Sequence, residues 1–169
     1  MKFKSIALAV ALSACMGAVA AQQPAAQPQQ QPQQSQQPQQ QLTPEQQEQL
    51  ARQDADMANA AQQVVQLIDA DRAGEVWDLS TDTVKRMVPR DSFVEQISAD
   101  RTRLGAPAER GQPVVTRTQF QEGGEVPAGL YINIAFPTRF ANNAEPVREL
   151  VSFRLDEDQV WRVSGYSLR

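Results

Sequence analysis

The chain has 169 residues and a formal net charge of −4, and it contains no His and a single Cys, Cys15. Without His, and with its one Cys near the N-terminus, it offers no nucleophile–His pair, no Cys/His zinc site and no haem or iron–sulfur ligands. We therefore expect no cofactor and no metal site, and no residue is assigned a catalytic role. The net acidity argues against nucleic acid as a partner, because phosphates are bound by a concentrated basic surface.

Residues 1–21 have the pattern of a secretory signal peptide. Lys2 and Lys4 give a charged start, an apolar run begins at Ile6, and small residues around Ala20 suit signal-peptide cleavage. The run is shorter than the roughly 20 residues that span a bilayer, so no transmembrane helix is expected after processing. The prediction is a periplasmic or secreted protein. Removal of the segment leaves 14 Lys and Arg against 20 Asp and Glu, and no Cys for a disulfide.

Cys15 leaves a second interpretation of the same segment open. Leu12-Ser13-Ala14-Cys15 resembles a bacterial lipobox, in which the Cys is diacylated and becomes the N-terminus. Against this, only fourteen residues precede Cys15, and the sequence stays apolar to Ala21, where a lipoprotein tether is usually polar. Cleavage near Ala20 or Ala21 is the preferred prediction. Attachment to the outer membrane by a lipid anchor on Cys15 is the alternative.

Residues 22–42 are predicted to be a disordered linker. The stretch from Gln22 to Gln41 contains 13 Gln and 4 Pro in 20 residues. Such a composition has too few apolar side chains to offset the entropy lost when a chain folds. A passive spacer is the simpler interpretation, and a Gln-rich segment for self-association is the other.

Residues 43–169 are predicted to form a single globular α+β domain that begins with helices. Thr43, Pro44 and Gln46 have the pattern of a capping box with Pro at the first helical position, and apolar residues at helical spacing continue to about Asp71. Short helices are expected over Glu75–Leu79 and Thr81–Met87. A longer helix, capped by Asp91 or Ser92, is expected to end at Gly105, and its predicted apolar face consists of Phe93, Ile97, Arg101 and Leu104.

After Gly105 the apolar period changes to two, which indicates strands. Four are predicted, over Pro113–Phe120, Leu130–Phe136, Arg148–Leu155 and Val160–Leu168, and a tight polar turn makes the last two an antiparallel hairpin. Each strand has one apolar row. We therefore expect a roughly four-stranded antiparallel sheet with the N-terminal helices packed on one face.

Carboxylates are the side chains left for acid–base chemistry, and the candidates are Asp78 and Glu149. Asp78 is better explained as a helix-surface or capping residue. Glu149 shares a row with Val151, which places its carboxylate toward the helices, and Arg101 projects from the apolar side of the last helix. An Arg101–Glu149 ion pair that locks this helix to the sheet is predicted, with a polar ligand site made of the same pair as the sharper alternative.

The other face of the sheet is predicted to be basic and aromatic. The alternation of the four strands assigns to it Arg117, Tyr131, Arg154, Arg162 and Tyr166. A solvated face held by cross-strand pairs is the simpler interpretation. A binding face for an anionic glycan, peptide or partner protein is the alternative, because Arg and Tyr are favoured in such interfaces.

From about Ala60 onward the chain resembles a bacterial exported family known as domain of unknown function 4019. The resemblance rests on short motifs in a fixed order along the chain: Leu67-Ile68-Asp69-Ala70, Trp77-Asp78, Arg101 with Leu104-Gly105, Arg110, Gly129-Leu130-Tyr131, Phe136, Phe140-Ala141-Asn142, Glu149 and Trp161 to Tyr166. Two departures are visible, since Phe93 stands where the family tends to have Trp, and residues 123–127 modify the Pro and Gly loop of the family.

The resemblance implies an exported helix-and-sheet domain, with a cone of the nuclear-transport-factor-2-like type or a cystatin-like arrangement as its candidate forms. It carries over no catalytic residue, and it draws attention to Arg101, Glu149 and Trp161. The leading functional prediction is a non-catalytic binding or scaffolding module whose partner is an envelope protein, a glycan or a small ligand. The alternative is a cone-fold small-ligand binder or enzyme that uses a buried Asp or Glu in a pocket between helices and sheet.

Overall fold

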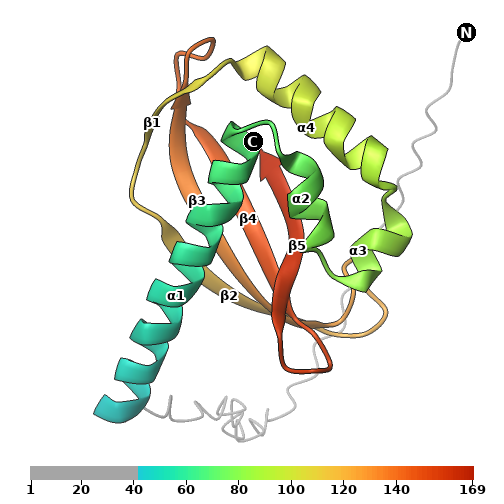
Figure 1. The fold of residues 1–169 in the computed structure, drawn as a ribbon. Helices are drawn as coiled ribbons and strands as arrows, with labels where there is room; N and C mark the ends of the chain where they lie inside the picture. The colour runs from blue at the N-terminus through green and yellow to red at the C-terminus, as the bar shows by residue number, and fades with distance from the viewer. Residues whose placement is uncertain (1–41) are drawn as a thin grey trace, which may run out of the picture. The chain divides into compact units, whose positions relative to one another are not determined.

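A computed structural model describes residues 42–169, in which four helices precede five strands (Figure 1). The helices are α1 (Pro44–Asp69), α2 (Ala73–Asp78), α3 (Asp82–Met87) and α4 (Arg90–Leu104). The strands are β1 (Pro107–Arg110), β2 (Val114–Phe120), β3 (Gly129–Phe140), β4 (Val147–Leu155) and β5 (Trp161–Leu168). The predicted signal peptide, Cys15 and nearly all of the predicted linker lie outside the described residues.

Helix α1 begins as its sequence predicts. The backbone N–H of Gln46 donates to Thr43 Oγ1, and the backbone N–H of Thr43 donates to Gln46 Oε1, which completes the capping box. One face of the helix is buried against the sheet, and its buried residues are Met57, Ala61, Val64, Val65 and Ile68. None of the described helices is both long and apolar enough to cross a membrane.

Two of the later helices differ from prediction at their starts. Helix α2 begins at Ala73 and includes Gly74, where the Arg90 guanidinium occupies the place that a Cβ would take. Helix α4 begins at Arg90 after Pro89, so Asp91 lies in its first turn instead of capping it. The predicted end at Gly105 is confirmed, and its φ of 80° is a conformation that only Gly adopts easily.

The sheet is open, antiparallel and five-stranded, where four strands were predicted. Strands β3, β4 and β5 lie side by side, while β1 and β2 pair with opposite ends of β3. The additional strand, β1, has only four residues, begins with Pro107 and has an irregular register, so its sequence carries no clear alternation. It forms because β3 continues past Phe136 to Phe140 and offers it a partner.

Pro137 explains why β3 could be expected to end early and why it does not. A Pro has no N–H for a strand ladder and is tolerated where no donor is needed. The carbonyl of Pro137 accepts from the Gly111 N–H between β1 and β2. The missing donor of Pro137 therefore falls in the gap between these two strands, and the pairing with β4 continues through Arg148.

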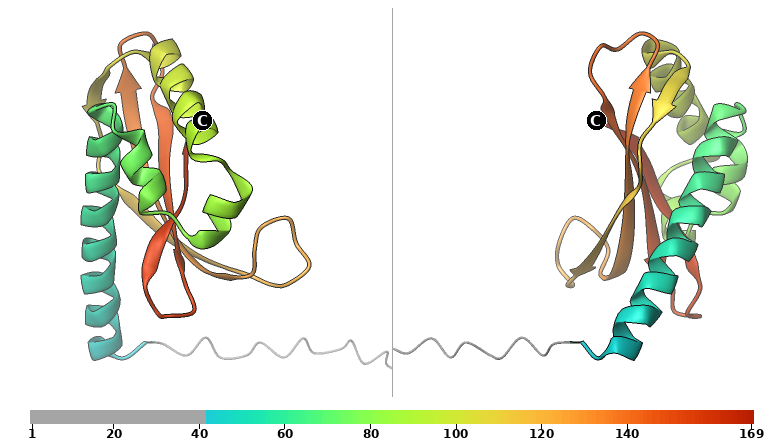
Figure 2. Two further views of the ribbon diagram at one scale, coloured as in Figure 1. Left: turned by 45° about the vertical axis from the view of Figure 1, so that its right-hand side comes forward. Right: turned by 90° about the vertical axis from the view of Figure 1, so that its left-hand side faces the viewer.

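The helices lie on one side of the sheet, and the core is between them (Figure 2). The inward rows of β3 and β4 supply most of the sheet side of the core, including Ile132, Ile134, Phe136, Val151 and Phe153. Trp161 of β5 is partly buried against the same cluster. The predicted α+β class is confirmed. The finer choice between a cone and a cystatin-like arrangement stays a prediction.

Candidate functional site

Glu149 on β4 is the one fully buried charged side chain among the described residues, with none of its surface exposed. It lies in the inward row of the strand, two residues before Val151. A buried carboxylate is costly unless it is paired and hydrogen-bonded. The surroundings of Glu149 must therefore supply several donors.

Four side chains from the described part of the chain contact the Glu149 carboxylate. Arg110 from β1 makes a two-pronged contact, with Nε 2.7 Å from Oε2 and Nη2 3.2 Å from Oε1. The Thr138 hydroxyl donates to Oε2 at 2.8 Å, and the Tyr166 hydroxyl donates to Oε1 at 2.8 Å. Arg101 Nη1 lies 3.5 Å from Oε1, within ion-pair range.

Asp69 at the C-terminal end of α1 extends these contacts into a network of four charges. Its Oδ1 is 2.6 Å from Arg101 Nη2, and its Oδ2 is 3.0 Å from Arg110 Nη1. Two carboxylates and two guanidinium groups therefore balance one another. We call Asp69, Arg101, Arg110 and Glu149 the four-charge network. It joins α1, α4, β1 and β4, which are distant in sequence.

The predicted Arg101–Glu149 ion pair is present, although Arg110 is the closer partner. The closest contact of Arg101 is Asp69, and its guanidinium also lies 5.1 Å from the centre of the Phe140 ring. No pattern in the sequence pairs Arg110 with Glu149, because the short strand that positions Arg110 was not predicted. The use of this pair as a ligand site stays a prediction.

The pKa values of Arg110, which belongs to the network, and of Tyr166, which contacts it, are both raised. Burial alone would lower the pKa of Arg110, but hydrogen bonds to Glu149 and Asp69 raise the pKa above its usual value. Burial, together with the negative charge of Glu149, raises the pKa of the Tyr166 hydroxyl well above its ordinary value. Tyr166 therefore acts at neutral pH as a protonated donor to Glu149.

This arrangement suits a structural lock better than acid–base catalysis. Both oxygens of Glu149 already accept from guanidinium or hydroxyl groups, so no acceptor position is directed at a substrate. Asp78, the second candidate carboxylate, is exposed and lies 3.4 Å from Arg90. Neither carboxylate lines the main cleft of the domain.

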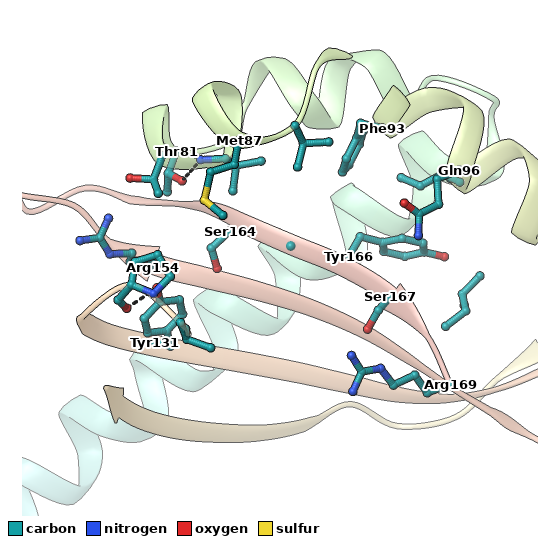
Figure 3. A pocket seen from close by; sticks show the side chains of 18 of the residues that line it. Thr81, Met87, Phe93, Gln96, Tyr131, Arg154, Ser164, Tyr166, Ser167 and Arg169 are labelled. Atoms are coloured by element: carbon teal, nitrogen blue, oxygen red, sulfur yellow. Dashed lines mark hydrogen bonds between the residues drawn. The ribbon is translucent and has the colours of Figure 1, made fainter. Parts of the chain in front are cut away.

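That cleft has a volume of about 480 Å³ and lies between helices α3 and α4 on one side and strand β5 on the other (Figure 3). Its helix wall is largely apolar and includes Val84, Met87, Phe93 and Ile97. Its strand wall consists of Ser164 to Arg169, and Tyr131 and Arg154 close one end. The Tyr166 ring lines the cleft while its hydroxyl contacts Glu149, so Tyr166 connects the cleft to the four-charge network.

Two residues assigned to the outer face of the sheet lie on the other face. Arg117 pairs in register with Ile132 and contacts α1, with Nη1 2.7 Å from Asp54 Oδ1. The prediction was wrong because β2 has Val114 and Val115 in succession, and Val115 is the one that packs on the core. The pattern did not decide which row faces inward.

Tyr166 was misplaced for a different reason. The pairing of β4 with β5 shifts between Ser152 and Phe153, and Ser164 is an extra residue in β5. Because side chains alternate with period two, one extra residue moves every later residue to the opposite face. Tyr166 therefore lies opposite Val151 and points toward the helices.

The other three residues of the predicted outer face are together but are largely used within the domain. Tyr131 is 6% exposed, and its hydroxyl donates to the Pro127 carbonyl. Arg154 and Arg162 both contact Asp156, at 3.6 and 3.1 Å. Arg162 also pairs with Asp158 at 2.7 Å and holds the pKa of that carboxyl at about 2. This face is therefore not an open basic surface.

Replacement of Glu149 by Gln tests how much the network contributes to the stability of the fold. The amide removes a negative charge and directs a donor at the guanidinium groups, so we expect Glu149→Gln to lower the free energy of unfolding by about 3–5 kcal/mol. Glu109→Gln is the matched control on the exposed Glu109–Arg139 pair, with an expected change of at most about 0.5 kcal/mol. Denaturant titration gives both values, and equal losses would contradict the role of the network.

The raised tyrosine pKa values predict an alkaline limit to stability. The chain has two Tyr, and the pKa of each is raised above about 10 in the fold. A raised pKa contributes stability that is complete below the unfolded value and is lost as pH rises through the folded value. We expect phenolate absorbance to appear together with loss of near-ultraviolet circular dichroism. In the Tyr166→Phe variant, the remaining Tyr131 should also ionise above pH 10 and together with unfolding. A tyrosine that titrates near pH 10 in the folded protein would contradict this prediction.

Comparison with known proteins places the site in a family context. Residues 60–166 match the family described as protein of unknown function (DUF4019), a range that extends from the middle of α1 to β5 and includes all four charges of the network. No curated protein and no solved structure matched the chain. Since the family match covers more than half of the sequence, the chain belongs to the DUF4019 family.

Proposed function

We propose that residues 42–169 form a non-catalytic binding module, and that its binding site is the cleft between α3–α4 and β5. The observation that carries this proposal is the separation of the cleft from the buried carboxylate. The cleft is of ligand size and has an apolar wall with a few polar groups, as binding sites usually do. Glu149 is shielded from it by Tyr166.

The alternative, an enzyme that uses a buried carboxylate, has less support. Asp100 is the carboxylate side chain that lines the cleft, and it is partly exposed and paired with Arg103 at 3.0 Å. A general base needs a free acceptor directed at its substrate. The cleft therefore suits a partner or ligand that presents an apolar group, held against Met87 and Phe93.

The site of action is proposed from the sequence. The charged start, the apolar run and the small residues before Gln22 support export. A binding domain behind a Gln- and Pro-rich segment would act in the periplasm or outside the cell. Attachment through an acylated Cys15 would instead hold it at the outer membrane.

The cleft can be tested with 8-anilinonaphthalene-1-sulfonate, a probe with an apolar ring system and one negative charge. We expect native protein to bind the probe, and Met87→Glu to weaken binding about tenfold through lost apolar contact and charge repulsion. Leu79→Glu is the matched control, because Leu79 is also an exposed apolar residue, at 55% against 67% for Met87, but does not line the cleft. Absence of binding to native protein, or equal loss in both variants, would refute the proposed site.

The mass of the mature protein distinguishes the two forms of export. Cleavage near Ala20 or Ala21 gives a chain without Cys and without added lipid. We expect this mass in the periplasmic or culture fraction. A diacylglyceryl-modified N-terminal Cys15 would show that the anchored form is correct, and an uncleaved chain in the cytoplasm would contradict export altogether.

A further inference from the structure

Strand β5 is an edge strand, and part of its free edge is already used by the chain itself. The N–H of Val163 donates to the Leu79 carbonyl, and the carbonyl of Val163 accepts from the Thr81 N–H. The segment between α2 and α3 thus lies beside β5, where Ser80 and Val163 form an isolated parallel bridge. Beyond the bulge at Ser164 no described segment continues this pairing.

The hydrogen bonds between β4 and β5 show which backbone groups are left on this edge. Arg148 and Arg169 exchange both of their backbone hydrogen bonds. In an antiparallel pair such positions alternate with positions whose N–H and C=O point away from the partner strand. Leu168 and Tyr166 occupy those alternate positions, opposite Glu149 and Val151. Their N–H and C=O groups therefore point away from β4, and both residues line the cleft.

This part of the edge lacks most of the features that usually prevent a strand from pairing with another chain. Edges are commonly protected by Pro, by charged side chains or by a covering element in contact with them. The segment Gly165-Tyr166-Ser167-Leu168 has no Pro and no charge. Helices α3 and α4 pass over it, but a cleft of about 480 Å³ remains between them and the strand (Figure 3).

We infer that the cleft takes an extended segment of another protein, which adds to β5 as a further strand and alternates apolar with acidic side chains. In an added strand, the residues beside Tyr166 and Leu168 point toward α4, where Phe93 and Ile97 form an apolar wall. The residues between them point to the outer side of the sheet, where the cleft is lined by the side chains of Arg154 and Arg169.

The acidic residues of the bound segment are inferred from the charge of the cleft. Arg154 and Arg169 lie at opposite ends of the cleft in Figure 3. Within residues 42–169, Arg169 forms no ion pair, and Arg154 is 3.6 Å from its one carboxylate partner, Asp156. The cleft carboxylate, Asp100, is already paired with Arg103. The side-chain charge that is left unpaired on the cleft is therefore positive, although the protein as a whole is acidic.

This inference rests on the proposed function and makes it more specific, since it names the backbone of a peptide as the main recognition element. Backbone hydrogen bonds to the edge would provide affinity, and the alternate pockets would provide specificity.

A library of random decapeptides displayed on phage, selected against the purified protein, tests the inference. We expect enriched peptides in which apolar and acidic residues alternate. The best peptide is then synthesised with N-methyl groups on every second residue, in both registers. One register removes the N–H groups that face β5 and should weaken binding at least about tenfold, while the other should change it about twofold or less.

Amide hydrogen exchange locates the bound peptide on the protein. In free protein the Tyr166 and Leu168 N–H groups should exchange quickly, and those of Val163 and Ser167, which are bonded within the fold, slowly. The selected peptide should slow amide exchange at Tyr166 and Leu168 specifically. Met87→Glu should weaken binding of the peptide and Leu79→Glu should not, because Met87 lines the cleft and Leu79 does not.

Several outcomes would overturn the inference. They are the absence of any enriched peptide, equal effects of N-methylation in both registers, and slow exchange of Tyr166 and Leu168 in free monomer. Protection of these two amides in a dimer of the protein would show that a second copy occupies the edge. If the naphthalene sulfonate probe binds in the cleft and no peptide does, the proposed binding site stands and the peptide inference fails.

Discussion

The rest of the structure depends on the burial of one carboxylate, Glu149, between two arginines. A charge without contact to water must be matched in position as well as in sign, since a misplaced partner leaves it unpaired at a cost of several kcal/mol. Here the two arginines come from a short strand and a helix, and both also pair with Asp69 at the end of another helix. Each arginine can contact both carboxylates in only one arrangement of these elements. We therefore infer that the network contributes more to the choice of that arrangement than to net stability.

Tyr166 links the buried charges to the cleft. Its hydroxyl is held by Glu149 and its ring forms part of the cleft wall, so the position of the wall is set by the buried charges. A wall that is fixed before binding loses little freedom when a partner arrives, which favours affinity. The bulge at Ser164 is what makes this possible, because without the extra residue Tyr166 would point to the outer face, away from both Glu149 and the helices.

The same two features mark the limit of what the sequence could predict. Periodicity was sufficient for the capped start and buried stripe of α1, for the inward rows of β3 and β4, and for the approach of Arg101 to Glu149. It was not sufficient for Tyr166, because a bulge leaves no trace in an alternating pattern. It also failed for Arg110, since a four-residue strand that includes Pro107 is stabilised by its partner strand and not by its own pattern.

The residues that mark the family divide between the two parts of the domain. Asp69, Arg101, Arg110, Glu149 and Tyr166, which belong to the motifs of the family resemblance, converge on the network. The departures from the family pattern fall elsewhere, since Phe93 and the end of the modified loop, Val126 and Pro127, line the cleft. One fold can carry different functions, because function depends on the site and not on the fold. We infer that in this chain the four-charge network serves the fold, whereas Phe93 and the end of the loop serve the cleft.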